Sequence, residues 1–174
     1  MRALFLDRDG VINIEKDGSY IFGPEELHFY EGALEGIAIA RRYFDIVLVV
    51  TNQRGIGRGL MTAEQLHEIH ASLLLNLQDK GGHIEAFYFA PSIDNDNALR
   101  KPNTGMALLA KEDYPDIDFS RSVMIGNNLS DMRFGKTMGM HTVFLHTTQD
   151  KIALPHELID EQFDSLQAWS QSLQ

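Results

Sequence analysis

The chain has 174 residues, no cysteine and a formal net charge of -10, and 44% of its residues are hydrophobic. This composition is typical of a globular domain with its own core, and it excludes disulfides and thiolate metal sites. So negative a charge argues against a nucleic acid partner, and no apolar run approaches the roughly 20 residues that span a bilayer. The Met-Arg start leads into a strand and is not a signal peptide, so we expect one cytoplasmic domain over residues 1–174 with no membrane partner.

The first predicted strand ends in two carboxylates. Residues 3–6 form an unbroken apolar run, which is typical of a strand buried on both faces of a parallel sheet. Asp7 and Asp9 follow, and Gly10 permits the tight turn that aims both side chains at one point. Two carboxylates this close repel each other, and a bound cation would keep both ionised. The same residues are also typical of a strand that simply ends in a polar turn, so residues further along the chain decide between the two interpretations.

Strands and helices alternate along the rest of the chain. After a turn-rich segment at 14–30, this alternation predicts an α/β fold: a doubly wound, Rossmann-like parallel sheet with helices on both faces. Thr62 and Gln65 form a capping box at the start of a long helix. In that helix, the spacing of His67 and His70 allows a metal pair but favours solvent-facing or partly buried side chains. The predicted strands are 3–6, 46–50, 84–89, 122–125 and 142–145, with a short edge strand at Leu158–Ile159, and the predicted helices are 31–43, 62–77, 104–111, 129–138 and a last one around Phe163, Leu166 and Trp169.

Reactive and polar residues follow four of the predicted strands. They are Asp7, Asp9, Thr51, Lys101, Asn127 and Asp131. Because the carboxyl ends of parallel strands meet at one edge of a sheet, we expect these side chains to lie together. They form a set suited to phosphoryl transfer, in which a carboxylate attacks phosphorus, a metal neutralises charge, and a hydroxyl and a lysine hold the equatorial oxygens.

A glycine-rich loop at residues 54–59 follows the second of these strands. It lacks the Gly-Lys-Ser/Thr ending of a nucleotide-binding loop, so we interpret it as shaping the entry for the substrate. Arg54 and Arg58 in this loop either meet a second anionic group or are simply solvated.

Four strings in a fixed order carry a resemblance to a known family. They are Phe5–Asn13 (FLDRDGVIN), Val50–Gly59 (VTNQRGIGRG), Arg100–Met106 (RKPNTGM) and Ile125–Met132 (IGNNLSDM). With them the chain resembles the haloacid dehalogenase-like (HAD-like) phosphohydrolases, in the branch that contains the heptose bisphosphate phosphatases and the histidinol phosphatases. The resemblance covers residues 3 to about 147, and no insertion large enough for a cap domain is visible.

The resemblance implies a Mg²⁺-dependent phosphomonoesterase that acts on a small phosphorylated metabolite, such as a heptose bisphosphate or histidinol phosphate. Asp7 would be the nucleophile that forms an aspartyl-phosphate, and Asp9 would protonate the leaving oxygen and then activate water. Thr51 and Lys101 would bind the transferring phosphoryl group. Further contacts to substrate phosphate or hydroxyls would come from Asn52 and Arg100.

The resemblance also implies how the metal is held, and here the chain departs from the family twice. Mg²⁺ would be held by the Asp7 carboxylate, the Asp9 carbonyl and the side chain at position 127, with Asp131 in support. Position 127 is asparagine where the family usually has aspartate, which removes a formal charge. The family often carries a small zinc loop, but residues 91–99 are short and contain no cysteine, so we expect no structural zinc.

Two other classes of function compete with the enzyme. The first is a phosphate-binding or regulatory domain on the same scaffold, with catalysis weakened by Asn127. The second is a phospho-acceptor signalling domain, which would usually lack the paired aspartates. We favour the phosphatase and expect it to act as a monomer.

Overall fold

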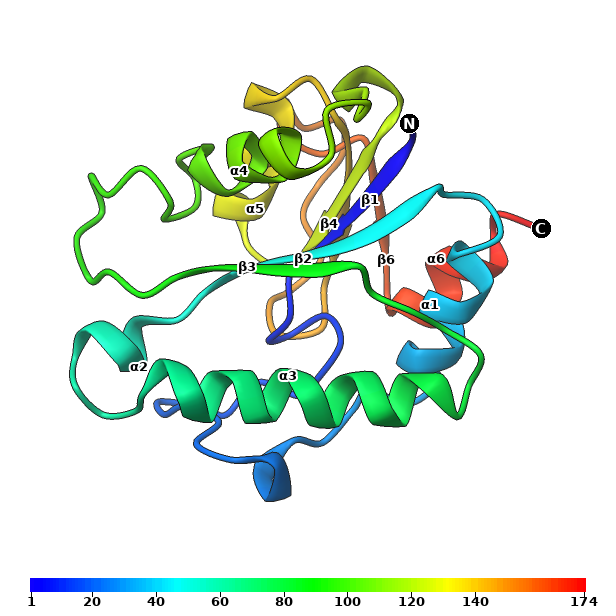
Figure 1. Cartoon of the computed structure of the whole chain (residues 1–174). Coiled ribbons are helices and arrows are strands. Elements are labelled where there is room, and N and C mark those ends of the chain that lie inside the picture. The colour runs from blue at the N-terminus through cyan, green and yellow to red at the C-terminus, as the bar shows by residue number, and fades with distance from the viewer.

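Six parallel strands form a single sheet in the order β3-β2-β1-β4-β5-β6 (Figure 1). The computed structural model describes all residues from Met1 to Gln174. This confirms the predicted α/β class, a doubly wound parallel sheet without a large cap. The strands are β1 (Ala3–Leu6), β2 (Ile46–Asn52), β3 (Ala86–Ala90), β4 (Val123–Gly126), β5 (His141–Leu145) and β6 (Glu161–Phe163).

Strand β1 lies inside the sheet, between β2 and β4. Its last residue, Leu6, pairs with Val49 on one side and Ile125 on the other. Alternate side chains point to opposite faces, so Leu4 and Leu6 enter one hydrophobic core and Phe5 enters the other. The chain adds β2 and β3 on one side of β1, and then β4, β5 and β6 on the other side. The strand order therefore reverses between β1 and β4, and doubly wound sheets bind ligands beyond the carboxyl ends of the strands at such a point.

Helices cover both faces of the sheet (Figure 1). Helices α1, α3 and α6 pack on one face, and α4 and α5 pack on the other. The capping box of Thr62 and Gln65 is present at the start of α3, as predicted. No helix is long and apolar enough to span a bilayer. The helices are α1 (Ala33–Ala40), α2 (Arg54–Gly57), α3 (Ala63–Gln78), α4 (Gly105–Asp113), α5 (Leu129–Thr137) and α6 (Leu166–Gln171), with 3-10 turns at Pro24–Glu26 and Phe119–Arg121.

The edge strand predicted at Leu158–Ile159 was wrong by three to four residues, since β6 begins at Glu161 and ends at Phe163. Ile159 is buried, and it packs in a small cluster with Met132 and Phe144. The backbone pairing to β5 is made instead by Glu161–Phe163, whose side chains are exposed or half-buried. The apolar pair Leu158–Ile159 therefore belongs to a small hydrophobic cluster beside the edge of the sheet, and not to the strand itself.

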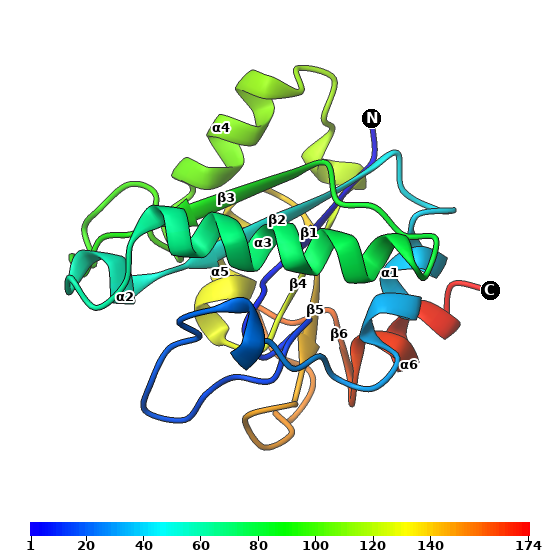
Figure 2. The ribbon, with the colours of Figure 1, turned by 60° about the horizontal axis from the view of Figure 1, so that its bottom comes forward.

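The glycine-rich segment after β2 is not an open loop throughout, because Arg54–Gly57 forms the single turn of helix α2. Gly55 lies so close to Tyr20 and Met61 that a Cβ atom at this position would be 3.1 Å from Tyr20 and 3.0 Å from Met61. Tyr20 belongs to the segment of residues 14–30, which is blue in Figure 2 and lies toward the same end of the molecule as α2. These two segments form walls around the carboxyl ends of the strands.

Candidate active site

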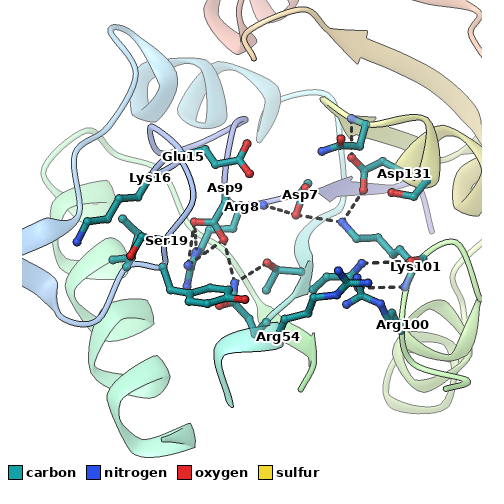
Figure 3. Close-up of a pocket in the computed structure, with 17 residues that line it drawn as sticks. Asp7, Arg8, Asp9, Glu15, Lys16, Ser19, Arg54, Arg100, Lys101 and Asp131 are labelled. Atoms are coloured by element: carbon teal, nitrogen blue, oxygen red, sulfur yellow. Dashed lines mark hydrogen bonds and ion pairs between the residues drawn. The ribbon is translucent and has the colours of Figure 1, made fainter. Parts of the chain in front are cut away.

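A cavity of about 370 Å³ opens at the carboxyl ends of the strands (Figure 3). Seven of the eight predicted site residues line this cavity, and the eighth, Asn127, does not line it and has no exposed surface. The structure thus brings together residues from four separate strand ends. The predicted residues that line the cavity are Asp7, Asp9, Thr51, Asn52, Arg100, Lys101 and Asp131.

Asp7 stands directly beyond β1. Its backbone N–H still donates to the Ile125 carbonyl at 3.0 Å, which fixes the start of the turn. Its Oδ1 accepts a hydrogen bond from the Arg8 N–H at 2.8 Å, whereas its Oδ2 accepts no hydrogen bond from the protein. Burial raises the pKa of Asp7 to about 7, although the charge of Lys101 acts in the opposite direction. The free Oδ2 is the atom that this geometry leaves available to a ligand.

Lys101 places a buried ammonium between two carboxylates. Its Nζ lies 3.0 Å from Asp7 Oδ1 and 2.7 Å from Asp131 Oδ1, and its side chain is 1% exposed. Burial alone would lower the pKa of Lys101, but the charges of Asp131 and Asp7 raise it, so the ammonium stays charged. Both contacts have ion-pair distances without well-directed hydrogen-bond geometry. The N–H donors can therefore turn toward an anion in the cavity.

Asn52 holds the backbone of Lys101 in place. Its Nδ2 donates to the Lys101 carbonyl at 3.2 Å, and its Oδ1 accepts from the Lys101 N–H at 3.0 Å. The amide that we expected to touch substrate is therefore committed on both sides to the main chain. Asn52 lines the cavity, but its principal contact is with the segment that presents the lysine.

Asp9 is held by three donors. The Arg8 guanidinium lies 2.9 Å from both carboxylate oxygens, Asn13 Nδ2 donates at 3.0 Å, and Gln53 Nε2 donates at 2.9 Å. Burial would raise the pKa of Asp9, but the Arg8 charge and these hydrogen bonds lower it below its usual value. Asp9 is therefore ionised at neutral pH. Gln53 also donates to the hydroxyl of Thr51, so one amide connects the ends of β1 and β2.

The residues that could hold a cation meet under the turn at Gly10. This residue has φ +84°, and a Cβ atom here would lie 2.1 Å from the Asn127 amide. No cluster of three His, Cys, Asp or Glu side chains is arranged for a metal. The Asp9 carbonyl accepts no backbone hydrogen bond, and the Asp7 carboxylate offers Oδ1 in addition to the free Oδ2. Together with the Asn127 amide oxygen, these hard oxygen donors fit Mg²⁺, which accepts carbonyl and carboxylate ligands.

Two arginines form another wall of the cavity. Arg54 Nη2 and Arg100 Nε share the acceptor Asn95 Oδ1, at 2.9 and 3.3 Å, and neither arginine pairs with a carboxylate (Figure 3). The Nε of Arg54 is buried without a partner. Burial and the neighbouring Arg54 charge both lower the pKa of Arg100. Two converging cations without a counter-charge form a site for an anionic group.

Sequence reasoning missed several residues around the cavity. Arg8 lies between the two aspartates and is 1% exposed, so it belongs to the buried layer and not to solvent. Its place one residue from each aspartate in a strand-end motif was the available signal. Gln53 offered a similar signal, since it directly follows Thr51 and Asn52. No such signal marked the residues of segment 14–30 that line the cavity, which are Glu15, Lys16, Ser19, Tyr20 and Ile21.

The two histidines of α3 have different surroundings. His67 is exposed, whereas His70 is 5% exposed, and its Nε2 lies 3.4 Å from Arg8 Nη1. Burial, together with the charge of Arg8, lowers the pKa of His70 to about 3. His70 is therefore a buried neutral imidazole, and His67 is solvent-facing, which are the two surroundings that the spacing favours.

This depressed pKa predicts acid-sensitive stability. Below pH 6.5, the ordinary pKa of histidine, the unfolded chain binds a proton at His70 that the folded chain does not bind. The free energy of unfolding therefore decreases as the pH is lowered. We expect the wild type to lose about 1.4 kcal/mol more than His70→Phe between pH 7.5 and 5.5. Denaturant unfolding of both proteins at the two pH values measures this difference. Equal losses would show that His70 is protonated in the folded state.

Comparisons with known proteins identify the family of this chain. The profile of the HAD-hydrolase-like family matches residues 98–167. A D-glycero-alpha-D-manno-heptose-1,7-bisphosphate 7-phosphatase of Burkholderia mallei is 36% identical over 157 residues, covering 86% of this chain and 82% of that protein. A D-glycero-beta-D-manno-heptose-1,7-bisphosphate 7-phosphatase of Neisseria meningitidis is 33% identical over 180 residues, covering 98% and 94%. The crystal structure of D,D-heptose 1,7-bisphosphate phosphatase from B. bronchiseptica, complexed with magnesium and phosphate, superposes with a TM-score of 0.87 at 29% identity, covering 99% and 98% of the two chains.

A doubly wound sheet with paired aspartates beyond its central strand, and relatives at this level of identity, define a HAD-like hydrolase. The chain belongs to this family, in the branch of the heptose 1,7-bisphosphate phosphatases. It is an enzyme that hydrolyses phosphoric monoesters, as the resemblance implied.

Proposed function

We propose that this chain is a Mg²⁺-dependent phosphatase that removes one phosphate from a heptose 1,7-bisphosphate through an aspartyl-phosphate on Asp7. The observation that carries this proposal is the Lys101 ammonium, buried beside Asp7 and Asp131 with no well-directed hydrogen bond. It supports a site that receives a phosphoryl group next to a carboxylate nucleophile. Release of inorganic phosphate from heptose 1,7-bisphosphate in excess Mg²⁺, against a panel of other phosphorylated metabolites, tests the proposal.

In the first half-reaction, Asp7 Oδ2 attacks phosphorus and the bond from phosphorus to the sugar oxygen breaks. Lys101 and the Thr51 hydroxyl hold the equatorial oxygens of the phosphoryl group. Asp9 delivers a proton to the departing sugar oxygen. The pKa of Asp9 is low in the free protein, and the negative charge of a bound substrate raises it toward the value that this role requires.

In the second half-reaction, a water molecule attacks the aspartyl-phosphate and Asp7 leaves as a carboxylate. Asp9, ionised since it gave its proton to the sugar oxygen and stabilised as a carboxylate by Arg8, Asn13 and Gln53, takes the proton from this water. Bound Mg²⁺ would supply positive charge to the phosphoryl oxygens and the nucleophile, and Asp7, the Asp9 carbonyl and Asn127 would hold it, with Asp131 in support.

Position 127 gives a prediction about the metal. An amide oxygen is a neutral ligand, so Asn127→Asp should lower the Mg²⁺ concentration for half-maximal activity, by about tenfold. Asn127 Nδ2 donates to the Thr148 hydroxyl at 2.7 Å, and that hydroxyl can donate to a carboxylate instead, so the fold tolerates the change. Magnesium titrations of both proteins measure the shift. Superimposable titrations would mean that position 127 does not hold the metal.

The Arg54 and Arg100 pair is proposed to bind the phosphate that is not hydrolysed. We expect Arg54→Met and Arg100→Met each to lower kcat/KM for heptose 1,7-bisphosphate by about tenfold, since a hydrogen bond to a charged group is lost. The matching heptose 7-phosphate lacks the second phosphate, so kcat/KM for this substrate should fall less than threefold in either variant. Arg58→Met is the matched control, because Arg58 is exposed in the same segment. Equal losses with both substrates would contradict the assignment.

The regulatory-domain alternative rests on Asn127 alone. It predicts a wild type that is inactive on every ester at saturating Mg²⁺, with activity appearing in Asn127→Asp. The proposed enzyme predicts turnover by the wild type, so the same titrations separate the two functions.

We also propose that the loop between β3 and Lys101 holds no structural zinc. Residues 91–99 contain no cysteine and no histidine. A side chain fastens this loop instead, since Asn103 Nδ2 donates to the carbonyls of Asn95 and Asn97, both at 2.9 Å. Hydrogen bonds can thus hold the loop beside the cavity in the absence of a metal.

A further inference from the structure

The Arg8 guanidinium is a full charge with almost no access to water. It is 1% exposed, and a buried charge of this kind needs partners for its donors. Its Nη2 and Nε point to Asp9, at 2.9 and 3.3 Å. These contacts occupy one edge of the planar group and leave the donors of Nη1 on the other edge.

His70 meets that other edge from helix α3. Its Nε2 lies 3.4 Å from Arg8 Nη1, at the long end of the hydrogen-bond range, and 62 residues separate the two in the chain. A neutral imidazole that carries its proton on Nδ1 offers a lone pair at Nε2, which an arginine donor can use. The imidazole stacks on the ring of Phe87 in β3, with ring centroids 4.2 Å apart and ring planes at 16° to each other. The imidazole is therefore held in place by α3 and β3 and not by the cavity.

The other two donors to Asp9 are also anchored at a second point. Asn13 Nδ2 bonds to the Ile14 carbonyl as well as to Asp9, and Gln53 Nε2 bonds to the Thr51 hydroxyl as well as to Asp9. Arg8 gives the charged contact, and its second anchor is His70. Without His70, one edge of a buried guanidinium would have no acceptor, and the plane of the group would be free to tilt.

We propose that His70 is a positioning residue that fixes the orientation of Asp9 through the guanidinium of Arg8. This inference rests on the proposed function, since it assumes that Asp9 transfers the proton to the leaving oxygen. A carboxylate held by a two-point contact follows the plane of its arginine, and small displacements of a catalytic group cost large factors in rate. His70 would thus govern the step that needs Asp9, while binding of the phosphoryl group by Lys101 and Thr51 continues.

The leaving group separates this role from a merely structural one. A sugar alkoxide needs the proton of Asp9 when it departs, whereas p-nitrophenolate departs without one, and kcat/KM reports this first half-reaction. For His70→Phe, which keeps a ring on Phe87 but removes the acceptor, we expect kcat/KM to fall about 30-fold with heptose 1,7-bisphosphate. With p-nitrophenyl phosphate the fall should be less than about threefold. His70→Gln restores an acceptor and should recover most of the loss. His67→Phe, one turn away and exposed, should match the wild type with both substrates.

The outcomes are distinct. Equal losses with both esters, or a loss in His70→Gln as large as in His70→Phe, would overturn the positioning role and leave a packing role. Wild-type values for His70→Phe would overturn it as well, and in both cases an active wild type leaves the proposed function standing. A wild type that hydrolyses neither ester would overturn the proposed function and this inference together.

Discussion

We expect Asp7→Asn to remove nearly all turnover, with a fall in kcat of at least about 10³-fold. An amide oxygen cannot replace the carboxylate as nucleophile, and Oδ2 of Asp7 is the oxygen that the protein leaves free. The fold should survive, because burial disfavours the charged carboxylate of Asp7, whose pKa is raised to about 7, and a neutral amide does not carry this penalty. Lys101 also keeps Asp131 as an ion-pair partner. Phosphate release under saturating Mg²⁺ measures the effect.

Two controls make this result specific. Asp17→Asn removes a charge from an exposed position in the segment beside the cavity and should have wild-type activity. Acid quenching of the wild type during turnover, followed by mass spectrometry, should place a phosphate on the peptide that contains Asp7. Wild-type turnover in Asp7→Asn, or a phosphate on another residue, would show that the nucleophile lies elsewhere.

The second large effect is expected for Lys101→Ala. Loss of a charge-assisted contact to the transferring phosphoryl group should cost about 3 kcal/mol of transition-state stabilisation, roughly a 150-fold fall in kcat/KM. A change of less than tenfold would contradict the role. The substitution also leaves Asp7 and Asp131 without their buried cation, and we expect the free energy of unfolding to fall by roughly 3 kcal/mol.

A double variant separates the loss of stability from the loss of catalysis. Lys101→Ala with Asp131→Asn removes both charges of the Lys101–Asp131 ion pair, whose atoms are 2.7 Å apart. Its thermal unfolding should move back toward that of the wild type, while its activity should stay as low as in the single variant. Recovery of activity with stability would mean that Lys101 only holds the fold together.

Most of the sheet could be predicted from the sequence because its four inner strands are buried on both faces. Five apolar runs marked five strands within two residues at either end, since a strand between two layers of helices has no polar face to blur the pattern. The sixth strand failed for the opposite reason. Glu161–Phe163 lies at the edge of the sheet with exposed or half-buried side chains, so its sequence carries no run, and the neighbouring apolar pair drew the prediction away.

The site was predictable where a residue's place follows from a strand end, and not where it follows from side-chain partners. Asp7, Thr51, Lys101 and Asp131 meet because parallel strands end at one edge. That Asn52 grips the Lys101 backbone, or that a histidine of α3 reaches Arg8, depends on rotamers and on helix position. No periodicity in the sequence encodes those contacts.

The central place of β1 also governs the order in which the active site can form during synthesis. β1 leaves the ribosome well before either of its neighbours, and its pairing to β4 must wait for residues 123–125. Until then one side of β1 is an unpaired hydrophobic edge, the kind of surface that aggregates or recruits chaperones. The Asp7 and Asp131 carboxylates cannot share Lys101 before this stage. Nascent chains halted before residue 123 should therefore be sensitive to protease, and chains halted late enough for α5 to emerge should become resistant.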